Sequence, residues 1–205
     1  MNLQNAYYEQ KFENLFLRAK GYEFQTFFER LMGLAYKADF MACRPWGGEG
    51  DRKNDGFLKS ERCLFQVYAP NEMEAKKATA KITEDFEGAK LYWEKHFNKW
   101  CFVHNAVDGL PPHVHELLLG FERDNPDIEL EPWGLEELRE VFRRVCSEDR
   151  LSWLGPAPDK GTRAGLGFQN IQIVLESLAA RPPLPLRSSK RFRPVRSRPM
   201  ICPRA

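Results

Sequence analysis

The sequence predicts an α/β protein in which helices flank a mixed central sheet. Segments with apolar residues at helical spacing alternate with short segments of strand length. They occur in the order helix, three strands, helix, strand, helix, strand, helix, which is typical of a sheet flanked by helices. The chain has 205 residues, of which 42% are hydrophobic, and can therefore bury a core of ordinary size.

The first half of the chain supplies the first helices and three strands. Residues 1–20 are expected to form a polar helix whose role the sequence does not reveal. A second helix is expected from Gly21, because apolar residues recur every three or four positions from Phe24 to Ala35. Three short strands are then expected at residues 40–44, 54–58 and 62–68, with a hairpin turn at residues 59–61.

A long helix is expected after Pro70, where Asn71 and Glu74 have the spacing of a capping box. Its apolar stripe runs from Ala75 to Phe97 in steps of three and four residues. The pattern then predicts a strand at residues 100–107, a short helix at 114–121, a strand at 128–132 and a helix at 135–145.

The chain changes character after Ser147. Residues 153–158 are expected to form a loop or docking segment, and residues 168–180 an amphipathic helix. Residues 181–205 contain six prolines and seven arginines, and they are expected to be disordered unless their composition reflects a reading frame lost near Arg181. We therefore divide the chain into a domain over residues 1–147, a linker and docking helix over 148–180, and a basic tail over 181–205.

The charge is distributed unevenly along the chain. The net charge is +2, but eight of the 31 basic residues lie in residues 181–205, which contain no acid. The other 180 residues carry 23 basic and 29 acidic groups, a balance of −6. Any affinity of the folded part for nucleic acid must therefore come from a local basic patch or from the tail.

No apolar run approaches the roughly 20 residues that span a bilayer. The first residues lack the pattern of a secretion signal, and the five cysteines are scattered without a Cys-x-x-Cys pair. These features indicate a cytoplasmic protein with reduced thiols and no membrane partner.

The stretch around which the other elements are arranged is residues 47–56, with the sequence GGEGDRKNDG, followed by the strand segment CLFQVY at residues 63–68. Side chains alternate along a strand, so Gln66 and Tyr68 share one face and Phe65 and Val67 share the other. Asp55 on the neighbouring strand is expected to lie opposite the first face. An acid placed opposite two polar groups is typical of a metal-dependent phosphodiesterase site.

This arrangement resembles the PD-(D/E)XK nuclease superfamily, and within it the Mrr-type restriction endonucleases, which combine such a glycine-rich loop with a Gln-x-Lys strand. The resemblance covers roughly residues 21–107 and implies a restriction-endonuclease-like core with further C-terminal helices. It also implies Mg²⁺ or Mn²⁺ at the site and DNA as the substrate. The lysine of the family pattern is replaced by Tyr68, which cannot supply its positive charge.

The resemblance assigns metal binding to Asp55, Gln66 and Glu29. Asp55 supplies a carboxylate, or is a turn aspartate before Gly56. Gln66 supplies a carbonyl oxygen, or is a glutamine on an exposed strand face. Glu29 resembles a helical acid that assists metal binding, or is a solvated helix acid.

Lys53, Lys76 and Lys77 could replace the missing cation from another position, or be ordinary surface lysines. With Arg52 they are the candidate contacts to nucleic acid.

Two hypotheses follow. The chain is either a bacterial restriction or antiviral defence endonuclease with a degraded site, or a catalytically inactive subunit of that fold used for sensing or assembly. The nuclease-like domain, followed by the segment LGPAP at residues 154–158 and a helix, also resembles the N-terminal portion of accessory subunits in bacterial ABC-three-component defence systems, which implies other subunits of a defence complex as partners. A homodimer is a further expectation.

Overall fold

The computed structural model describes residues 3–44, 52–158 and 175–176. The first compact unit of the chain ends at Pro158. Half of the glycine-rich stretch, residues 47–51, lies outside the described residues, as do the expected tail over 181–205 and nearly all of the helix expected at 168–180. Residues 175–176 are helical and exposed. No helix among the described residues is long and apolar enough to cross a membrane.

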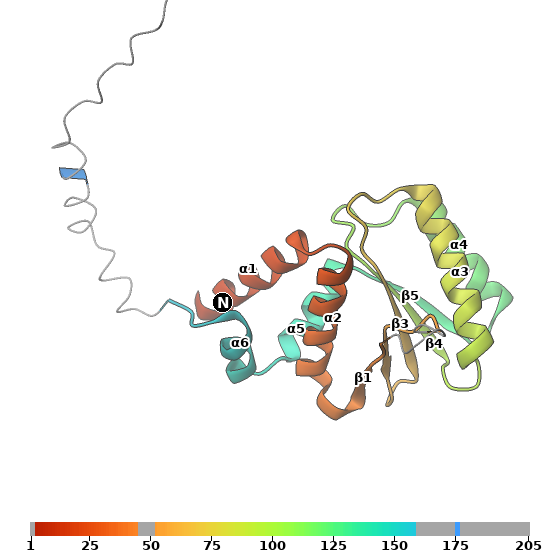
Figure 1. Ribbon diagram of the computed structural model, residues 1–205, viewed down its shortest axis with the longest axis horizontal. Helices are drawn as coiled ribbons and strands as arrows, with labels where there is room; N and C mark the ends of the chain where they lie inside the picture. Colours follow the sequence, from red (N-terminus) through yellow and green to blue (C-terminus); the bar gives the residue numbers. More distant parts are fainter. Residues whose placement is uncertain (1–2, 45–51, 159–174, 177–205) are drawn as a thin grey trace, which may run out of the picture. The chain divides into compact units, whose positions relative to one another are not determined.

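A five-stranded mixed sheet forms the centre of the compact unit, and its strands are ordered in space as in the sequence (Figure 1). The strands are β1 (Phe40–Ala42), β2 (Gly56–Leu58), β3 (Cys63–Tyr68), β4 (Lys99–His104) and β5 (Glu129–Trp133). The first three strands pair in antiparallel fashion, whereas β4 and β5 run parallel to β3. The predicted mixed sheet is therefore confirmed.

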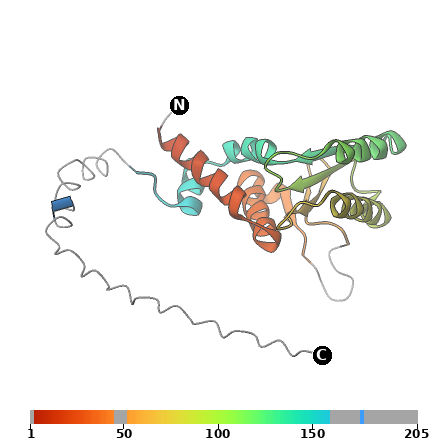
Figure 2. The same cartoon turned by 90° about the horizontal axis from the view of Figure 1, so that it is seen from above.

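Helices cover both faces of this sheet (Figures 1 and 2). One face carries α1 (Leu3–Arg18), α2 (Gly21–Tyr36), α5 (Leu135–Arg144) and α6 (Ser147–Leu154), and the other carries α3 (Ala75–Trp93) and α4 (Pro112–Asp124). A 3-10 turn, Lys37–Asp39, joins α2 to β1. The parallel strands need crossover connections, and α3 and α4 provide them.

Strand β3 divides the core into two clusters. Cys63 and Phe65 are buried in the cluster beneath α1, α2 and α5, while Leu64 is buried in the cluster beneath α3 and α4. Val67 and Tyr68 are partly buried against the first and second cluster, respectively. This confirms the predicted division of the strand into two faces, and it shows that helices cover both of them.

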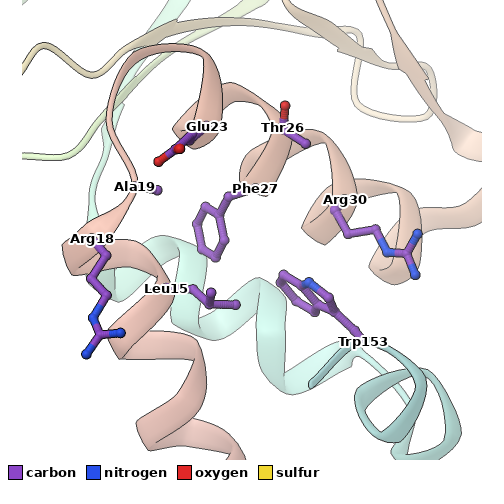
Figure 3. Close-up of a pocket in the computed structure, with 8 residues that line it drawn as sticks. All are labelled: Leu15, Arg18, Ala19, Glu23, Thr26, Phe27, Arg30 and Trp153. Atoms are coloured by element: carbon purple, nitrogen blue, oxygen red, sulfur yellow. The ribbon is translucent and has the colours of Figure 1, made fainter. Parts of the chain in front are cut away.

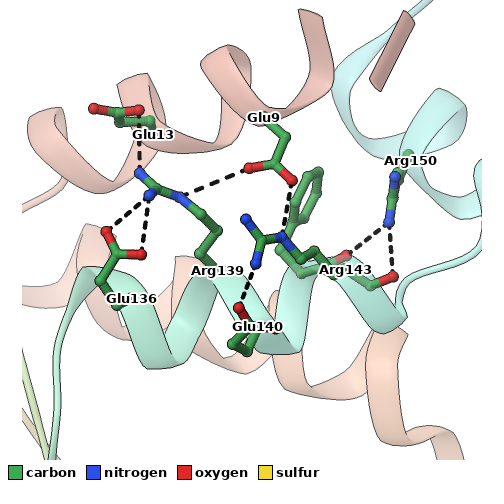
Figure 4. Close-up of polar contacts among 8 residues, drawn as sticks. Glu9, Glu13, Glu136, Arg139, Glu140, Arg143 and Arg150 are labelled. Carbon is green, nitrogen blue, oxygen red and sulfur yellow. Dashed lines mark hydrogen bonds and ion pairs between the residues drawn. The ribbon is translucent and has the colours of Figure 1, made fainter. Parts of the chain in front are cut away.

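The role of the first helix, which the sequence did not reveal, is to pack against α5 (Figure 4). Phe12 of α1 stacks on Phe142 of α5, with ring centroids 4.6 Å apart. Beside this contact, Arg139 pairs with Glu9 at 3.7 Å and with Glu13 at 3.2 Å. Shared partners of this kind form a network, which holds α1 more firmly than isolated surface pairs would.

Two local predictions were wrong. Helix α3 begins at Ala75 with Glu74 as its N-cap, and no side chain caps it, so Asn71 and Glu74 do not form the expected capping box. Residues 153 and 154 were expected in a loop or docking segment; the loop is wrong, because they end helix α6, where Trp153 and Leu154 pack against the first core cluster. Helix α6 therefore belongs to the compact unit.

The four cysteines within the described residues are free thiols. This agrees with the expectation of reduced cysteines for those four positions.

Candidate functional site

Asp55 lies directly before β2 and is almost completely buried, with 4% of its surface exposed. Its backbone N–H donates to the carbonyl oxygen of Phe65, and its own carbonyl oxygen accepts from the backbone N–H of Cys43. Of its carboxylate oxygens, Oδ2 accepts from the backbone N–H of Val67 at 2.7 Å, and Oδ1 accepts from Nε2 of Gln25 at 2.9 Å. These contacts fix the carboxylate against β3 in a defined orientation.

Gln66 lies on β3 and is also buried, with 4% exposure. This excludes the alternative of a glutamine on an exposed strand face. Its Oε1 has no hydrogen-bond partner among the residues that the structure describes. Because buried polar groups are nearly always paired, such an oxygen indicates a missing partner.

Asn54, which precedes Asp55, is a second unsatisfied group at this end of the sheet. It is fully buried, and within the described ranges neither polar atom of its side chain has a partner. An unpaired buried polar group costs about 1 to 3 kcal/mol. Asn54 and Gln66 adjoin the two residues of the contact between Asp55 and Val67. Because both unpaired side chains lower stability, a functional role explains them more easily than a structural one.

The carboxylate of Glu29 pairs with the guanidinium of Arg44, which also donates to the hydroxyl of Tyr22 at 3.1 Å. Glu29 follows Gln25 by four residues on α2, so the two lie on the same side of the helix. The sequence pattern indicated Glu29 but not Gln25, whose amide contacts Asp55 directly. The four-residue spacing between Gln25 and Glu29 was the sequence feature that could have identified Gln25.

Tyr68, which the sequence resemblance aligned with a lysine, is half-buried on β3. Its ring lies against Phe102, with centroids 6.0 Å apart, and its backbone position is in register with His104 on β4. A phenol there can donate a hydrogen bond but cannot offset negative charge.

Lys53 is directed toward α3. Its ammonium pairs with Glu84 and, at 3.1 Å, with the fully buried carboxylate of Asp85, which Lys81 contacts at 2.7 Å. Burial opposes the charge of Lys53, but the hydrogen bonds to Glu84 and Asp85 outweigh burial and raise its pKa. The charge of Lys53 is thus used to neutralise acids on α3.

The residues around Lys53 fasten the end of the glycine-rich loop to the same helix. The indole N–H of Trp93 donates to the carbonyl oxygen of Arg52 at 3.1 Å, and the guanidinium of Arg52 lies 5.4 Å from the ring centroid of Tyr92. Arg52 and Lys53 both have positive φ angles, 52° and 60°, which turn the chain onto α3. The C-terminal end of the loop is therefore held against α3.

Lys76 and Lys77 lie on the first turn of α3, and both are exposed. Lys77 pairs with Glu74 at 2.6 Å, with both side chains more than half exposed. Exposed pairs of this kind contribute little to stability, so both lysines are accessible to an external anion.

His104 ends β4 and is 5% exposed. Its Nδ1 accepts from the backbone N–H of Ala106 at 3.2 Å, and burial lowers its pKa to about 4, although Glu137 opposes this shift. With His115 and Glu137 it borders a cavity of about 280 Å³. His104 is therefore a buried histidine at the edge of this cavity.

The described residues contain no group of three or more histidine, cysteine, aspartate or glutamate side chains arranged to hold a metal. The donors that fit a hard cation are the Asp55 carboxylate and the Gln66 amide oxygen, because Mg²⁺ and Mn²⁺ prefer oxygen ligands. The unpartnered Oε1 of Gln66 is the feature that fits such an ion best.

Comparisons with protein-family models, with curated proteins and with solved structures yield no match to this chain.

Proposed function

We propose that this chain is a metal-dependent phosphodiesterase domain of the PD-(D/E)XK type that acts on DNA in the cytoplasm, as part of a bacterial restriction or antiviral defence system. The order of its elements supports this proposal. Helix α2, three antiparallel strands, helix α3 and the parallel strand β4 follow one another as the resembled core requires.

The buried amide oxygen of Gln66 is the observation that carries the proposal. It lacks a partner among the described residues, and the next residue along β3, Val67, binds the carboxylate of Asp55. A divalent cation would satisfy this oxygen and would remove the cost of leaving it unpaired. We propose Asp55 and Gln66 as the ligands. Glu29, which lies on α2 with the Asp55 partner Gln25, is a further candidate on the Asp55 side.

Bound Mg²⁺ or Mn²⁺ would stabilise negative charge on a scissile phosphate. The chain's own contribution is to hold Asp55 rigidly, through Val67 and Gln25, and to offer the Tyr68 hydroxyl as a hydrogen-bond donor. No positive charge comes from position 68. We therefore infer that cleavage is slow compared with that of an enzyme carrying the family's lysine.

A second candidate function is assembly or sensing by an inactive domain of the same type. Two observations favour it: Tyr68 stands in the lysine position, and the ammonium of Lys53 is paired with Glu84 and Asp85. In this case the domain would serve other subunits of a defence complex and would not cut DNA.

Calorimetric titration with Mn²⁺ tests the proposed metal site. The native chain should bind the ion, Asp55→Asn should abolish binding, and Asp108→Asn should leave it unchanged because Asp108 is an exposed loop acid. Circular dichroism would establish that each variant is folded. No binding by the native chain, or equal binding by Asp55→Asn, would contradict the proposal.

A further inference from the structure

An open groove lies between α1, α2 and α6, on the face of the sheet opposite α3 and α4. It has a volume of about 400 Å³, and Phe27 lies at its centre between Leu15 and Trp153 (Figure 3). A second hollow of about 440 Å³ shares Leu15, Arg18 and Trp153 with the first and extends to Leu154. The two hollows together make an elongated groove.

The floor of the groove is apolar and rigid. Phe27 is buried, and the Trp153 ring is held by Phe27 and Phe142, with centroids 5.9 and 6.1 Å away. Leu15 is 38% exposed at the edge. Because the aromatic rings are fixed by the core, the floor is available to a ligand without a conformational change.

The rim of the groove is basic. Arg18 and Arg30 are exposed at its two ends (Figure 3), and neither makes a hydrogen bond or ion pair with another residue in the described parts of the chain. Among the described residues, Arg30 has an electrostatic effect on Asp149, which is already paired with Lys37. Against these arginines, the lining contains one acid, Glu23.

The nearby arginines of α5 behave differently. Arg139 and Arg143, which also face α1, are both paired with glutamates (Figure 4). Arg18 and Arg30 differ from them in having no carboxylate partner among the described residues, so their charge is available at the groove.

We propose that this groove binds a segment of a partner protein in which large apolar side chains are flanked by carboxylates. Small ligands are usually enclosed over most of their surface, whereas this groove is open and elongated, as a peptide requires. The chain's own C-terminal part is a poor match, because residues 159–180 contain two basic and two acidic residues and residues 181–205 are basic. The inference is independent of whether the Asp55 site cuts DNA.

Selection from a displayed random-peptide library on the full-length chain tests this proposal, with counter-selection on the double variant Arg18→Glu/Arg30→Glu. The enriched peptides should combine large apolar residues with aspartate or glutamate. Their affinity, measured by fluorescence anisotropy, should fall about tenfold or more in the double variant and in Leu15→Glu. Arg123→Glu on α4 is the matched control and should bind like the native chain, because it lies on the other face of the sheet.

Four results would overturn the proposal. The first is that no peptide distinguishes the native chain from the double variant. The second is that the enriched peptides contain no acids. The third is that a synthetic peptide with the sequence of residues 168–180 binds as tightly as the selected peptides. The fourth is a dimer in sedimentation equilibrium that the double variant abolishes, because a second copy would then be the occupant.

Discussion

Replacing Gln66 by methionine should make the metal-free protein more stable, although it removes a proposed metal ligand. Methionine has the length of glutamine, and it would place an apolar thioether among Leu64, Tyr68 and Phe102 on this face of the sheet. The unpaired Oε1 costs about 1 to 3 kcal/mol. We expect the free energy of unfolding to rise by about 1 to 2 kcal/mol. Each kcal/mol corresponds to a rise of about 2 to 4 °C in Tm.

The assay is thermal or urea unfolding in the presence of a chelator, repeated with excess Mn²⁺. The ion should reverse the order of stability, because it stabilises only the native chain, by about 2.7 kcal/mol at a concentration 100 times Kd. Leu64→Met, on the same face of the same strand, controls for methionine itself and should cost less than about 1.5 kcal/mol. If Gln66→Met were clearly less stable than the native chain in chelator, the Gln66 oxygen would be satisfied in the folded protein and the reasoning would be refuted.

Two further predictions concern stability. The pKa of His104 is about 4 in the folded protein and about 6.5 in the unfolded chain. The stability that depends on uncharged His104 is therefore fully present above about pH 6.5 and is lost as pH falls toward 4. In urea titrations, the free energy of unfolding should fall by about 2 to 3 kcal/mol over this pH range, and this fall should be absent in His104→Asn. The same pH profile in the variant as in the native chain would refute this. Secondly, Gly120→Ala should stabilise α4 by up to about 1 kcal/mol because nothing lies within 4 Å of the added Cβ, whereas Gly88→Ala should destabilise the protein because its Cβ would lie 2.6 Å from Cγ of Lys53. Equal unfolding midpoints for the two alanine variants would mean that Lys53 does not pack on α3.

The sequence was sufficient to predict the sheet and most helices, because their apolar periodicity is regular. The stripe from Ala75 onward identified α3, and the alternation along residues 63–68 identified the two faces of β3. The start of α3 was predicted wrongly because the spacing of Asn71 and Glu74 is only a local signal. Helix α6 was missed because its eight residues have few apolar positions, and Trp153 and Leu154 become buried only through contacts with distant helices.

At the candidate site, the sequence indicated candidate residues but not their environments. The burial of Asp55 and Gln66 depends on helices that cover both faces of the sheet, which no short motif encodes. The contact of Gln25 with Asp55 joins residues 30 positions apart, and the pairing of Lys53 with Asp85 depends on how the chain turns at Arg52.

Cleavage of plasmid DNA with Mg²⁺ or Mn²⁺ by the native chain and by Tyr68→Lys tests the central claim most directly. Position 68 lies on the same face of β3 as Gln66, and the long stem of a lysine can follow the apolar surface while its ammonium reaches solvent. The native chain should be slow or inactive. Tyr68→Lys should be faster by about 10² to 10³, and Asp55→Ala in the same chain should abolish that gain. No cleavage by either folded form, with no metal bound at Asp55, would contradict the nuclease proposal and leave recognition or assembly as the function.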